Sequence, residues 1–127
     1  MVKDGLSDII KGASEPVSPR RDAILTVDEY IQNKRFYQGR LVAVKGKLVE
    51  YEMDSGLARS DVLLTLEGAE WKMGVGCYLS RLHGEHRMLD TDLQTNLGHE
   101  IRVEIDGTTK MMRTLTTASY TWTFKNQ

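Results

Sequence analysis

The 127-residue sequence is poor in the residues that constrain a chain covalently or conformationally. Its single cysteine, Cys77, excludes an internal disulfide framework and a multi-cysteine zinc site. Its two prolines, Pro16 and Pro19, both lie near the N-terminus, so from Ala23 onward no proline removes a backbone N–H from a strand. No apolar run approaches the length of a membrane span, and no secretion signal opens the chain. We therefore expect a cytoplasmic location, or a periplasmic or lipid-anchored one if a signal precedes Met1.

An excess of charge of one sign is also missing. Lysine and arginine total 17 and aspartate and glutamate total 18, which gives a net charge of -1. This balance excludes a binder held mainly by a polybasic surface, and equally an acidic disordered tail. Hydrophobic residues make up 40% and charged residues 28%, the usual proportions of a globular domain that buries a core.

Residues 1–22 differ in composition from the rest of the chain. They hold both prolines and several glycines and serines, and they bury too little surface to offset a chain entropy of roughly 1–2 kcal/mol per ordered residue. We predict a mobile N-terminal arm over 1–22 and one domain over 23–127. Within the arm, Leu6, Ile9 and Ile10 have helical spacing, so a partner protein could fold this stretch into one or two turns.

From residue 23 onward the pattern predicts two helices and five strands. Thr26 and Glu29 form a capping box, which predicts a short helix from Val27 to about Lys34. Residues 40–53 are long for one strand, and Gly46 inside them predicts a bulge or bend that lets the strand belong to two sheets. The other strands are expected over 61–66, 71–78, 99–106 and 111–124, and a stripe of leucines predicts a helix across 82–97.

Alternation assigns side chains of two strands to the core. The first set is Trp71, Met73, Val75 and Cys77, and the second, on the last strand, is Ala118, Tyr120, Trp122 and Phe124.

The order strand–strand–strand–helix–strand–strand is typical of a small closed Greek-key barrel. It predicts an all-β protein with the OB-fold, in which the helix lies between strands three and four. Residues 37–48, which contain Gly39, Val42, Val44 and Gly46, resemble the first-strand pattern of OB-fold proteins. Together with residues 30–33 and 75–77, they resemble the bacterial OB proteins related to tRNA-anticodon-binding domains. The resemblance implies a binding module for single-stranded nucleic acid or for proteins.

The usual ligand surface of such a barrel is the face of strands two and three with the adjoining loops. Single-stranded nucleic acid needs cations along its phosphates and rings on which bases stack. The cations and rings expected there are Lys45, Lys47, Tyr51, Arg59, Lys72, Tyr78, Lys110 and Arg113. Tyr51 and Tyr78 are the best stacking candidates, although packing under a loop explains them equally well. Gly74 and Gly76 would leave space for a ligand.

Chemistry beyond binding has little support in the sequence. His83 and His86 near Cys77 lack the further ligands of a zinc site, and no nucleophile elbow, phosphate-binding glycine loop or metalloprotease motif is present. We therefore expect no enzyme activity, no cofactor and no metal. Two interpretations stay open. The first is a module for single-stranded nucleic acid, and the second is a protein-interaction module that uses the barrel surface, a threonine-rich last strand edge and the arm.

Overall fold

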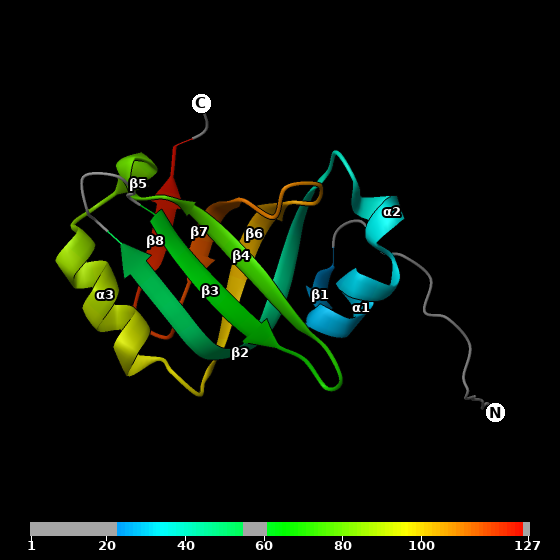
Figure 1. The fold of residues 1–127 in the computed structure, drawn as a ribbon, viewed down its shortest axis with the longest axis horizontal. Coiled ribbons are helices and arrows are strands. Elements are labelled where there is room, and N and C mark those ends of the chain that lie inside the picture. The colour runs from blue at the N-terminus through cyan, green and yellow to red at the C-terminus, as the bar shows by residue number, and fades with distance from the viewer. Residues whose placement is uncertain (1–22, 55–60, 126–127) are drawn as a thin grey trace.

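The fold is seen in a computed structural model, which describes residues 23–54 and 61–125 (Figure 1). The mobile arm predicted over 1–22 and the candidate site residue Arg59 lie outside the described residues.

Eight strands and three α-helices make up the described chain. The strands are β1 Ile24–Thr26, β2 Leu41–Asp54, β3 Asp61–Glu67, β4 Lys72–Tyr78, β5 Leu82–His83, β6 Glu100–Asp106, β7 Met112–Thr116 and β8 Thr121–Phe124. The helices are α1 Val27–Gln32, α2 Lys34–Tyr37 and α3 His86–Thr95, with a 3-10 turn over Leu79–Arg81.

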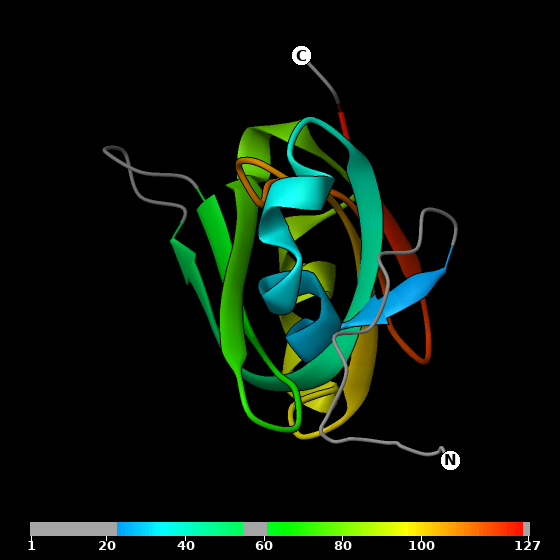
Figure 2. The ribbon, with the colours of Figure 1, turned by 90° about the vertical axis from the view of Figure 1, so that its right-hand side faces the viewer.

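The strands form one mostly antiparallel sheet, which confirms the all-β class. Its order is β4-β3-β2-β6-β7-β8-β5, and β1 pairs in parallel with β2. Figure 2 shows the sheet curling round on itself, and Figure 1 shows α1 and α2 at one end of it and α3 at the other. No ladder closes it within the described ranges: β4 meets the start of β7 through one isolated parallel bridge, Gly76 to Met111, where Gly76 N–H donates to Lys110 O at 3.2 Å. The prediction of five strands is wrong, because a turn over 117–120 divides the last one into β7 and β8 and because β1 and β5 add short pairings.

The long strand β2 serves two ladders, as predicted. Leu41–Lys47 pairs with β6 and Lys47–Asp54 pairs with β3, and the strand bends between them (Figure 1). The irregularity of register lies between Leu48 and Glu50 rather than at Gly46. Gly46 instead makes room for α1, because a Cβ built there would lie 2.8 Å from Val27 Cγ2.

The helices follow the sequence signals closely at their starts and less closely at their ends. The capping box is confirmed: Glu29 N–H donates to Thr26 Oγ1 at 3.1 Å and Thr26 N–H donates to Glu29 Oε1 at 2.9 Å. The first helix ends at Gln32 and a second begins at Lys34, so the single helix that we predicted is two. The helix expected over 82–97 is shorter at both ends: α3 begins at His86, after Leu82 in β5, and it ends at Thr95, before the exposed Leu97.

Two of the aromatic side chains assigned to the core are exposed, and this part of the prediction is wrong. Trp71 precedes β4 in the β3–β4 turn, and Tyr120 lies in the turn before β8, so strand alternation does not apply to either of them. Ala118, in the same turn as Tyr120, is exposed as well. The other members of both sets are buried, including Val75, Cys77 and Trp122.

None of the helices in residues 23–54 and 61–125 is long and apolar enough to cross a lipid bilayer.

Candidate binding face on strands β2 to β4

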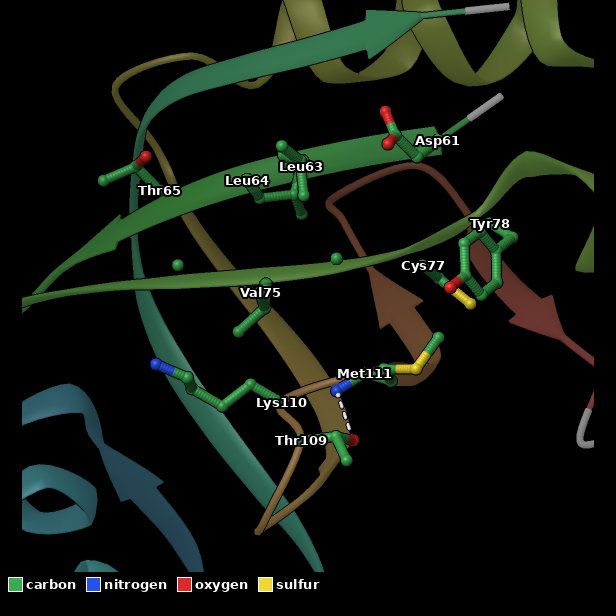
Figure 3. A pocket seen from close by; sticks show the side chains of 12 residues that line it. Asp61, Leu63, Leu64, Thr65, Val75, Cys77, Tyr78, Thr109, Lys110 and Met111 are labelled. Carbon is green, nitrogen blue, oxygen red and sulfur yellow. Dashed lines mark hydrogen bonds between the residues drawn. The ribbon is translucent and has the colours of Figure 1, made fainter. Parts of the chain in front are cut away.

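A groove of about 440 Å³ lies where the outer face of β3 and β4 meets the loop between β6 and β7 (Figure 3). Strand β3 contributes Leu63 and Thr65 to its lining, β4 contributes Gly74, and the loop contributes Lys110 and Met111. Most of the surface of this groove is apolar. It lies on the strand face and next to one of the loops on which the sequence placed a ligand.

The loop that walls the groove is held by Asp106. Its Oδ1 accepts the N–H groups of Thr108 at 2.7 Å and Thr109 at 3.0 Å. These two donors keep the pKa of Asp106 below its usual value. Lys110 then adopts a left-handed conformation with φ of 64°, which turns Met111 toward β4 and allows the bridge to Gly76. The groove wall is therefore fixed by backbone geometry.

The two glycines of β4 differ in how much space they leave. A Cβ at Gly74 would come no nearer than 3.9 Å to another heavy atom of its surroundings, so the sheet surface is open there. A Cβ at Gly76 would lie 2.6 Å from Leu63 Cδ2, because the leucine side chain covers this glycine. Leu63 itself is 42% exposed. The floor of the groove is therefore the uncovered backbone at Gly74 beside the exposed side chain of Leu63.

Charges on this face follow the cross-strand register. Lys47 and Lys72 both lie opposite Glu67, one on each side of it. The remaining rows of the face are Glu50–Thr65–Gly74, Glu52–Leu63–Gly76 and Asp54–Asp61–Tyr78. Away from the lysine row, the side chains of the three strands that face outward therefore carry carboxylates and no cation.

The structure brings only part of the predicted site together. Lys72, Tyr78 and Lys110 lie at or beside the groove, and Lys47 lies on the same face. Lys45 lies on the first half of β2, opposite Arg102 of β6, in a different hollow.

Two further candidate residues are engaged elsewhere. Arg113 is on β7, where its charge acts on Asp106. Tyr51 packs against the core and donates its hydroxyl to Asp90 Oδ1 at 2.6 Å, so it fastens α3 to β2. Of the two rings proposed for stacking, Tyr78 is the exposed one, at 52%, with the Arg81 guanidinium 5.1 Å from its centroid.

Sequence reasoning missed Leu63 and Met111. The run Val62-Leu63-Leu64 holds a signal for the first, because three consecutive apolar residues in a strand must place one of them on the outer face. For Met111 no local signal exists, since its position depends on the bridge to β4.

Two candidates for chemistry other than binding, a metal site and the Cys77 thiol, are located in the structure as follows. Over residues 23–54 and 61–125, no three His, Cys, Asp or Glu side chains are placed to hold a metal ion. The Cys77 thiol is buried, and burial raises its pKa, which disfavours the reactive thiolate. The chain matches no family model, and no curated protein matches it in sequence.

Proposed function

We propose that this chain is a non-enzymatic OB-fold binding module that takes a segment of another protein in the groove between β3, β4 and residues 109–111. The strand order β4-β3-β2-β6-β7, the single bridge between its ends and α3 between β4 and β6 support the OB-fold. They are also in keeping with the resemblance to tRNA-anticodon-binding OB proteins. The fold does not choose the ligand, so the choice rests on the site.

The character of the groove carries the choice of a protein ligand. An exposed leucine and a methionine wall it, and a bare backbone position lies between them. Apolar, concave surface of this kind is what the anchor side chains of protein partners fill.

A single-stranded nucleic acid is the competing ligand. It needs cations along its phosphates and several rings for its bases, each stack contributing about 1–3 kcal/mol. On this face two lysines flank Glu67 and one further lysine, Lys110, lines the groove, while the rows next to the groove carry carboxylates. Of the two rings proposed for stacking, Tyr78 is the exposed one. The charges therefore favour the protein ligand.

The test is a selection of short random peptides against the immobilised chain, followed by titration of the selected peptides by fluorescence anisotropy. Leu63→Ser changes the groove, and Leu41→Ser is the matched control, since Leu41 is an exposed strand leucine outside the groove. We expect Leu63→Ser to weaken binding about tenfold, the usual effect of losing an apolar anchor, and Leu41→Ser to leave it unchanged.

A labelled single-stranded oligonucleotide is titrated in parallel at low and moderate salt. Binding of the oligonucleotide that weakens steeply with salt, or equal peptide affinities for both variants, would overturn the proposal.

A further inference from the structure

The apolar groove does not stand alone on this face. A second hollow, of about 220 Å³, is lined by Glu50, Tyr51 and Glu52 and shares Leu63 and Thr65 with the groove. An apolar hollow and an acidic hollow therefore lie side by side with a common wall of two side chains.

We infer that the bound segment carries an apolar side chain and, two residues along an extended backbone, a lysine or arginine. This inference rests on the proposed protein ligand and states its chemistry. The apolar side chain packs against Leu63 and Met111 over the open surface at Gly74, and the cation lies between Glu50 and Glu52.

Among residues 23–54 and 61–125, no cation lies opposite the carboxylates of the acidic hollow in the register of the sheet. In the register of the sheet, Glu50 lies opposite Thr65 and Glu52 lies opposite Leu63, and beyond these come the two glycines of β4. Within the residues that the structure describes, neither glutamate takes part in an ion pair or a side-chain hydrogen bond. Two unpaired carboxylates beside an apolar groove favour a ligand that brings a positive charge with its apolar anchor.

The spacing between the two parts of the ligand follows from strand geometry. Strands of a sheet lie about 4.8 Å apart, so β4 and β2 are separated by about 10 Å. Side chains at i and i+2 of an extended peptide are about 7 Å apart on one face, and the flexible stem of lysine covers the remaining distance. The stem crosses β3 at the wall shared by the two hollows, where Thr65 lies between Gly74 and Glu50.

The experiment uses the full chain and synthetic peptides in which leucine, serine and lysine follow one another in a repeat. In one matched peptide glutamine replaces each lysine, and in another serine replaces each leucine. The acidic hollow is changed by the double variant Glu50→Gln/Glu52→Gln. The control is Glu85→Gln/Glu100→Gln, which removes the same charge at exposed positions outside both hollows.

We expect the lysine peptide to bind the parent chain about fivefold more tightly than the glutamine peptide at low salt, the effect of two exposed carboxylates acting together. Glu50→Gln/Glu52→Gln should abolish this difference, the control variant should retain it, and added salt should reduce it.

The failures are distinguishable. If the two peptides bind equally while binding still depends on leucine and on Leu63, the cationic position is wrong and the proposed function stands. If the lysine peptide still binds Glu50→Gln/Glu52→Gln more tightly than the glutamine peptide does, the cationic position is again wrong and the proposed function stands. If no peptide binds, or binding ignores Leu63→Ser, both proposals fail.

Discussion

The indole of Trp122 donates a hydrogen bond to the buried carboxylate of Asp92, with Nε1 2.8 Å from Oδ2. The Thr117 hydroxyl donates to the same oxygen at 2.7 Å, and the Asn96 amide donates to Oδ1 at 3.0 Å. Asp92 belongs to α3, whereas Trp122 is on β8 and Thr117 lies in the turn before it. One carboxylate therefore fastens the helix to the last hairpin.

Asp92→Ala should lower the free energy of unfolding by about 3 kcal/mol. The substitution removes charge-assisted hydrogen bonds and leaves the buried indole N–H and threonine hydroxyl without their acceptor. Thr117→Val removes one donor to Asp92 and also the acceptor of the Ser119 and Tyr120 N–H groups, and it should cost about 1–2 kcal/mol. Urea denaturation of the three proteins measures both effects. A loss below about 1 kcal/mol for Asp92→Ala would show that the network contributes little.

Gly76→Ala and Gly74→Ala should affect stability in different ways although the two residues are neighbours on one strand face. A methyl group at Gly76 would meet Leu63 Cδ2 at 2.6 Å and the carbonyl oxygen of Val62 at 2.8 Å, and the backbone cannot move away cheaply. We expect a loss of about 1–3 kcal/mol for Gly76→Ala.

A methyl group at Gly74 would make only an ordinary contact, 3.9 Å from the carbonyl oxygen of Leu64, so Gly74→Ala should be neutral or slightly stabilising because alanine restricts the unfolded chain. Thermal unfolding of both variants, monitored by circular dichroism, checks the pair. Equal losses in the two would contradict the difference in packing.

The sequence predicts what depends on neighbours along the chain. The capping box at Thr26, the two-ladder strand through Gly46 and the burial of Val75 and Trp122 all follow from local spacing. The prediction for Trp71 is wrong because the alternation of β4 begins at Lys72 and does not hold in the turn before it, where the backbone direction changes.

The candidate site was less predictable because it forms between segments that are distant in sequence. The pattern of β4 alone predicts Gly74 and Tyr78, which line the groove, and Lys72, which begins the same strand. The wall formed by Met111 depends on the loop held by Asp106, and the bonding of Tyr51 depends on where α3 packs. Neither contact leaves a trace in local spacing.

Asp28→Ala should destabilise the junction between α1 and the β3–β4 turn. The Asp28 carboxylate accepts the N–H of Glu70 and the N–H of Trp71, each at 3.1 Å. We expect a loss of about 1–2 kcal/mol, since both bonds are charge-assisted but exposed. Hydrogen exchange of the Trp71 amide should also become faster. Glu70→Ala is the control, because the backbone N–H of residue 70 remains, and exchange at Trp71 should then be unchanged.

Tyr51→Phe should flatten the loss of stability at alkaline pH. Burial, then the hydrogen bond to Asp90 and its negative charge, raise the pKa of Tyr51 from 10.0 to about 12. Between pH 10 and pH 12 the unfolded chain has released this proton and the folded chain has kept it, so the contribution to stability is complete below pH 10 and falls as the pH rises toward 12. Phenylalanine has no hydroxyl to ionise, so the free energy of unfolding of Tyr51→Phe should decline less steeply between pH 10 and pH 12 than that of the parent.

Asp90→Asn should lower the pKa of Tyr51 toward 10.0, which tyrosinate absorbance measures directly. Parallel declines for parent and Tyr51→Phe across this interval would show that Tyr51 ionises alike in the folded and unfolded chains.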